Sequence, residues 1–82
     1  MATKAICIWL DETSEPGTSA WIVSRDEINE AGEAETTSTL RTYEDGEYDA
    51  ALTYAKSEAA KRSLPLYSNP ADGPAVLLQE AV

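Results

Sequence analysis

One segment of the sequence, from residue 45 to residue 62, limits what the rest of the chain can fold into. Its apolar residues recur with the period of an α-helix and form one stripe: Tyr48, Ala51, Leu52, Ala55 and Ala59. Acidic residues crowd the start, and Lys61 and Arg62 close the end, so both signs match the helix dipole. We therefore expect Asp45 to be the N-cap of a helix over Gly46–Arg62. The stripe is rich in alanine, so this helix can pack closely on a sheet.

The other apolar segments are short and rich in β-formers, which predicts strands. A polar connection containing Pro-Gly separates the first two apolar segments. This predicts that they form an antiparallel hairpin with a long loop. The strands are expected at Ala5–Leu10, Ser19–Arg25, Thr36–Tyr43, Leu64–Tyr67 and Ala75–Leu78. A turn at Asn69–Pro74 separates the last two.

The stretch Asp26–Glu35 carries five acidic residues around Gly32 and admits two interpretations. It is either an exposed hairpin connection into which two strands continue, or a short helix that is capped by Asp26 and stopped by Gly32. We favour the hairpin.

The resulting element order is β-β-β-α-β-β. It predicts an α+β fold, an antiparallel β-meander with one α-helix packed on it. Because 82 residues are too few for two hydrophobic cores, residues 1–82 are expected to form a single domain. The order of the strands within the sheet stays open.

Cys7 is the single cysteine and lies inside an apolar run, so we expect a small buried hydrophobe and no intramolecular disulfide. The chain has no basic, apolar leader and no apolar stretch near the ~20 residues that span a bilayer. We therefore expect a cytoplasmic protein with no membrane partner. Trp9 and Trp21 each lie on an expected strand and are interpreted as core residues rather than as a base-stacking platform.

Charge is the unusual property of the composition. The formal net charge is −9, and the segment from Asp11 to Asp49 holds twelve acidic residues against two basic ones, Arg25 and Arg41. Such a chain repels nucleic acid and anionic membranes and is attracted to basic surfaces. Direct nucleic-acid binding is not expected.

The residue inventory argues against catalysis. There is no histidine, the lone thiol has no imidazole partner, and the glycines form neither a phosphate loop nor a dinucleotide-binding fingerprint. The acids of residues 26–35 lack the alternating pattern of a calcium loop. We expect no enzyme activity, no metal and no cofactor.

The acidic residues have two interpretations, which the sequence leaves open. They either keep the protein soluble or form a recognition surface that mimics a polyanion, since alternate strand side chains lie roughly 6.5–7 Å apart, close to the phosphate spacing of a nucleic-acid strand. In the second case the primary contacts are Asp26, Glu27, Glu30, Glu33 and Glu35. The supporting contacts are Glu44, Asp45, Glu47 and Asp49.

The chain as a whole resembles the small acidic proteins that phages encode against host defences, of the anti-CRISPR and DNA-mimicking anti-restriction type. The resemblance rests on size, charge, layout and the acidic stretch 26–35; the helix around Glu47–Lys56 followed by Leu64–Tyr67 also looks like small phage and bacterial domains. It implies a stoichiometric inhibitor, in the cytoplasm of a bacterial host, that fills a basic groove of a CRISPR effector complex. The alternative is a protein–protein adaptor or assembly module in which the strand Thr36–Tyr43, or the final strand, pairs with another chain or a second copy.

Overall fold

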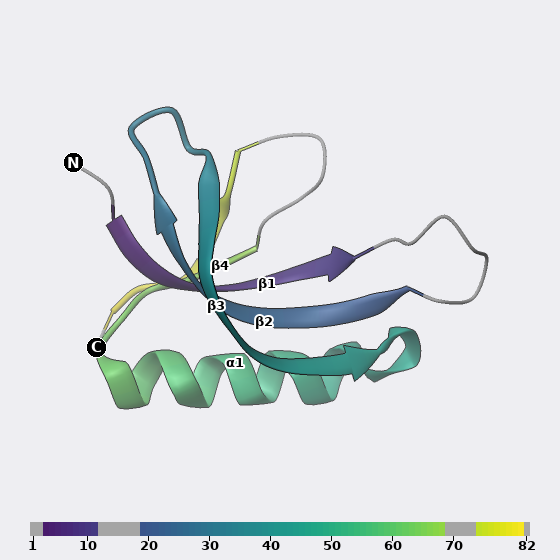
Figure 1. The fold of residues 1–82 in the computed structure, drawn as a ribbon. Coiled ribbons are helices and arrows are strands. Elements are labelled where there is room, and N and C mark those ends of the chain that lie inside the picture. Colours follow the sequence, from purple (N-terminus) through teal and green to yellow (C-terminus); the bar gives the residue numbers. More distant parts are fainter. Residues whose placement is uncertain (1–2, 12–18, 69–73, 82) are drawn as a thin grey trace.

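The computed structural model describes residues 3–11, 19–68 and 74–81, which form a five-stranded sheet with one α-helix across one face (Figure 1). The α+β prediction and the order of elements along the chain are confirmed for these residues. The elements are β1 (Thr3–Asp11), β2 (Ala20–Ile28), β3 (Ala34–Glu44), the 3₁₀ turn η1 (Asp45–Glu47), α1 (Tyr48–Arg62), β4 (Leu66–Ser68) and β5 (Val76–Gln79).

The sheet is mixed, so the prediction of a purely antiparallel meander is wrong. The strand order is β3-β2-β1-β4-β5, and β4 pairs with β1 in parallel while the other neighbours are antiparallel. The chain leaves the sheet at one edge after β3, crosses its face as α1, and returns as β4 in the direction of β3 and β1. A helical crossover of this kind is the usual link between strands that run the same way.

The main core lies between α1 and the sheet. Three alanines of the predicted stripe, Ala51, Ala55 and Ala59, are fully buried. They pack on Ile6, Ile8, Val23 and Leu66. Alanine has no side chain beyond Cβ, so the helix axis can approach the sheet closely at each of these turns. The predicted stripe is therefore the packed face of α1 from Ala51 to Ala59, whereas its first member, Tyr48, is exposed.

The start of the helix differs from the prediction, and its end agrees with it. Asp45 is not the N-cap of α1: Glu47 occupies that position, without a side-chain cap hydrogen bond. Glu44 is the N-cap of the preceding turn η1, in extended conformation, and forms a capping box with Glu47. The backbone N–H of Glu44 donates to Glu47 Oε1 at 3.2 Å. Glutamates three residues apart can satisfy each other's backbone donors, which favours this arrangement over a cap at Asp45. At the other end Ser63 adopts the left-handed conformation, with φ of 55°, and stops the helix.

The acidic stretch Asp26–Glu35 forms the hairpin that we favoured, not a helix. β2 continues to Ile28 and β3 begins at Ala34, so the turn covers only residues 29–33. Two register shifts interrupt the β2–β3 pairing, between Val23 and Ser24 and between Arg25 and Asp26. Bulges bend strands and increase their twist, and Figure 1 shows the hairpin curving so that its tip points away from α1.

A second apolar cluster lies on the face of the sheet opposite the helix. Its buried members are Ala5, Cys7 and Ile28, and Trp9, Ala34, Tyr67 and Ala75 pack against them. Trp21 packs instead on the helix side. Both tryptophans and Cys7 thus belong to packed clusters, as predicted. Residues 69–73 of the expected turn Asn69–Pro74 and most of the loop after Asp11 lie outside the described residues.

Candidate functional site

The acidic residues predicted to bind a partner fall into two separate clusters. The first, the helix-start cluster, consists of Glu44, Asp45, Glu47 and Asp49. All four are exposed. They come together because β3 ends directly at a 3₁₀ turn and the turn runs on into α1. Carboxylates at this end also interact favourably with the helix dipole.

The backbone under the helix-start cluster is held by aromatic residues. The indole Nε1 of Trp21 donates to the backbone oxygen of Asp45 at 3.0 Å. The Trp21 ring also contacts Tyr48, with the ring centroids 4.6 Å apart. These contacts tie the 3₁₀ turn to β2. A shallow open depression adjoins them, lined by Ser19, Ala20, Thr42, Tyr43, Glu44, Asp45 and Gly46.

No described basic side chain forms an ion pair with the helix-start cluster. The opposite end of α1 is different, because Glu58 there accepts from Arg62 at 3.4 Å. A hydrogen bond from the Tyr54 hydroxyl, followed by the charges of Lys61 and Arg62, lowers the pKa of Glu58. The negative charge at the start of the helix is thus left uncompensated by described residues.

The second cluster, the hairpin-tip cluster, consists of Glu27, Glu30, Glu33 and Glu35, all exposed. The Asn29 side chain organises the turn by accepting from the backbone N–H groups of Ala31 and Glu33, both at 3.0 Å. Glu27 and Glu35 lie directly opposite each other on β2 and β3. Like charges in that position are destabilising.

Lys4 is the basic residue nearest to the hairpin-tip cluster in the strand register. It is the β1 residue opposite Glu27, so one lysine stands beside the two facing glutamates. The hairpin-tip cluster therefore has a basic neighbour on β1, although Lys4 forms no ion pair with Glu27 or Glu35, all three of which the structure describes.

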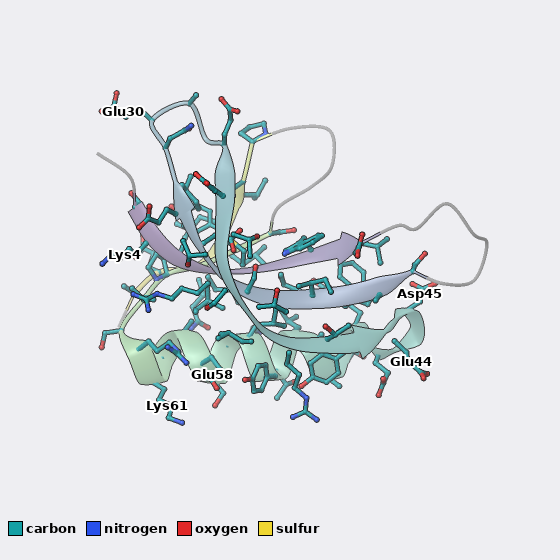
Figure 2. All side chains as sticks on the ribbon, viewed as in Figure 1. Lys4, Glu30, Glu44, Asp45, Glu58 and Lys61 are labelled. Carbon is teal, nitrogen blue, oxygen red and sulfur yellow. The ribbon has the colours of Figure 1, made fainter. Side chains whose placement is uncertain are left out.

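The structure does not bring the two clusters onto one patch. Figure 2 shows Glu30 at the hairpin tip and Glu44 and Asp45 at the far end of the molecule, near the start of α1. Between them along β3 lies Arg41, whose guanidinium stands 5.0 Å from the Tyr43 ring and 5.6 Å from the Tyr54 ring. The polar strand between the clusters thus also carries a positive charge.

Asp26 does not belong to either surface, which corrects its predicted role as an exposed contact. It is fully buried, on the face of the sheet opposite α1. Its Oδ1 accepts from Ser24 Oγ at 2.6 Å, and Ser24 Oγ in turn accepts from Trp9 Nε1 at 3.0 Å. Asp26 Oδ2 is buried and accepts no hydrogen bond of normal geometry from the described residues.

Cys7 is the other titratable group of this buried site. Burial, followed by the nearby Asp26 carboxylate, raises the pKa of the Cys7 thiol. A thiol is only a weak donor, so it does little to satisfy the carboxylate. The thiol stays protonated and unreactive while it is buried.

The burial of Asp26 had a signal in the sequence. Ile22, Ser24, Asp26 and Ile28 alternate along one strand, and side chains two residues apart face the same side. Asp26 therefore shares a face with two isoleucines. That signal was missed because the strand was expected to end at Arg25.

A comparison of the chain with protein-family models, with curated proteins and with solved structures gave no match. Within residues 3–11, 19–68 and 74–81, no helix has the length and apolar character needed to cross a bilayer.

Proposed function

We propose that this chain is an acidic binding protein that occupies a basic, nucleic-acid-binding surface of a bacterial defence complex, as a stoichiometric inhibitor of the anti-CRISPR type. One observation carries the proposal: the helix-start cluster presents four exposed carboxylates within six residues, and no described basic side chain pairs with them. A negative patch of this kind attracts lysine- and arginine-lined grooves and speeds encounter with them.

The helix-start cluster is assigned the primary contacts. Its backbone is tied down by the capping box and by Trp21, so little order has to be gained on binding. The hairpin-tip cluster has the supporting role, since Lys4 faces Glu27 and Asp26 is buried beneath it. This reverses the ranking expected from the sequence, which placed the contacts of residues 26–35 first.

The first experiment is a capture of partners from a lysate of CRISPR-bearing bacteria with the tagged protein, washed at low and at high salt. We expect a nucleic-acid-binding complex that is retained at low salt and released at high salt, because ionic strength screens exposed charges. Retention that does not change with salt would contradict the proposal, as would the absence of any basic partner.

A charge-reversal pair then locates the contact. The double variant Asp45→Lys/Asp49→Lys leaves both capping-box glutamates in place and is expected to weaken binding of the captured complex by about 100-fold or more at low salt. The measurement is the dissociation constant by titration calorimetry or surface-plasmon resonance. Far-UV circular dichroism checks that α1 is retained.

The matched control is Glu27→Lys/Glu35→Lys, which changes the net charge by the same amount at the hairpin tip. We expect it to weaken binding much less. Equal losses for the two double variants would mean that total charge, not the helix-start cluster, determines affinity.

A second candidate function, an assembly module that pairs through a sheet edge, is favoured by β5. This edge strand exposes three consecutive apolar side chains: Val76 is 53% exposed, and Leu77 and Leu78 are each 44% exposed. The other edge, β3, presents mainly polar side chains, so β5 is the edge suited to apolar pairing.

The variant Leu77→Lys tests the assembly module. A lysine on an edge strand opposes pairing, so any association through β5 should be lost by about tenfold or more. Sedimentation velocity of the wild type and the variant at several concentrations provides the measurement. A wild-type protein that is monomeric throughout and captures no partner through β5 would rule out this second function.

A further inference from the structure

Two distant parts of the chain meet at the face of the sheet opposite α1. No described helix covers this face, yet Cys7 and Asp26 are fully buried on it. Part of the cover comes from Ala75, just before β5, which packs on the cluster that contains Cys7. That segment therefore closes part of the face.

Ala75 is held by the tip of the β2–β3 hairpin. Its backbone N–H donates to the Gly32 carbonyl oxygen at 3.0 Å. Gly32 has φ of +83°, and a Cβ atom at that position would lie 2.8 Å from the Cβ of Pro74. Figure 1 shows the yellow segment that leads into β5 beside the upper part of the hairpin. We call the contact of Gly32 with Pro74 and Ala75 the latch.

Asp26 lies beside Cys7 on the same face of the sheet, in an unfavourable environment. One carboxylate oxygen is satisfied by Ser24, and the other is buried without a partner. A buried polar atom without a partner is unfavourable, and a buried charge more so. If opening of the latch let water reach Asp26, the water would hydrogen-bond to that oxygen. Opening would then remove the free-energy cost of burying the oxygen without a partner.

The latch is also weakly held and separate from the main core. It consists of a backbone hydrogen bond and contacts of a glycine, a proline and an alanine. β5 itself pairs with β4 over only a few residues, and its apolar side chains are largely exposed. The core under α1 lies on the other face of the sheet. Regions with few buried apolar contacts open at lower free energy than the whole domain.

We propose that the latch is a conformational switch: it opens while the core under α1 stays folded, and it thereby exposes the carboxylate of Asp26 and the thiol of Cys7. This device does not depend on the proposed binding function. Its open state presents a carboxylate and a thiol that the closed state hides from solvent and from any partner.

The reaction of Cys7 with an aromatic disulfide reagent tests the switch. The protein has one cysteine, so the released chromophore reports this thiol alone. The rate is measured from zero urea up to the unfolding transition, and far-UV circular dichroism follows α1 under the same conditions. We expect reaction in the absence of urea at a rate at least about tenfold above that allowed by global unfolding, with a weak urea dependence, because local opening exposes little surface.

Gly32→Ala should open the latch. Alanine is strained at this φ and its Cβ would meet Pro74, so the Cys7 reaction is expected to accelerate by ~10-fold to 100-fold. The matched control is Gly46→Ala, because a Cβ there has no atom within 4 Å. That control should leave the rate unchanged within about twofold.

Two outcomes would overturn the proposal. The first is a wild-type reaction whose urea dependence equals that of α1 unfolding, since Cys7 would then become accessible only when the whole domain unfolds. The second is an unchanged rate in a folded Gly32→Ala variant. If that variant does not fold, the urea dependence of the wild type decides alone.

Discussion

Replacing Ser24 by alanine is expected to lower the free energy of unfolding by about 3–5 kcal/mol. The Ser24 hydroxyl is the link of a buried chain: it accepts from Trp9 Nε1 and donates to Asp26 Oδ1. Alanine would remove both hydrogen bonds at once. Asp26, which already has one oxygen without a partner, would then lose the hydroxyl donor to its other oxygen.

Urea denaturation followed by tryptophan fluorescence and circular dichroism gives the free energy of unfolding. Ser38→Ala is the matched control, because Ser38 is an exposed serine on the neighbouring strand β3. It should change stability by no more than about 0.5 kcal/mol. Equal stabilities of the two alanine variants would show that the hydrogen-bond chain through Ser24 does not stabilise the fold.

Replacing Ala55 by glutamate should unfold the protein at room temperature. Ala55 is fully buried at the middle of the helix–sheet contact, among Ile6, Ile8 and Val23. A glutamate there would introduce both excess volume and an unpaired charge. Each effect costs about 1–3 kcal/mol or more, and together they approach the whole stability of a small domain.

Ala60→Glu separates this packing effect from helix propensity and net charge. Ala60 lies on the exposed side of the same helix, so the substitution makes the same chemical change in contact with water. We expect its thermal midpoint, followed by circular dichroism at 222 nm, to stay within a few degrees of the wild type. A cooperative transition of similar midpoint in both variants would contradict the close packing of α1 on the sheet.

The contribution of the sequence is clearest for the helix and weakest for the site. The 3.6-residue period singled out five residues, of which Ala51, Ala55 and Ala59 are buried, Leu52 is half-buried and Tyr48 is exposed. The apolar run around Cys7 predicted a buried strand, and β1 is buried along Ala5–Ile8. Both signals are local, because the pattern and the element that it specifies occupy the same residues.

The acidic site could be predicted residue by residue but not as a surface. Their charge predicted that all nine carboxylates are exposed, and eight of them are. The ninth, Asp26, is buried because its side chain lies on the inward-facing side of β2, where alternate residues are buried. Whether the exposed eight meet depends on how β3 bends between its two ends, and the bulges responsible have no clear sequence signal.

The types of element, their order, most of the packed face of the helix and the excess of negative charge could all be predicted from the sequence. Three features became visible only in the folded chain: β4 lies beside β1, the acids form two clusters, and Gly32 meets Pro74 on the face opposite the helix. The reason is physical. Periodicity and charge act between residues close in the chain, whereas strand neighbours and contacts between loops depend on which distant segments bury the most apolar surface together.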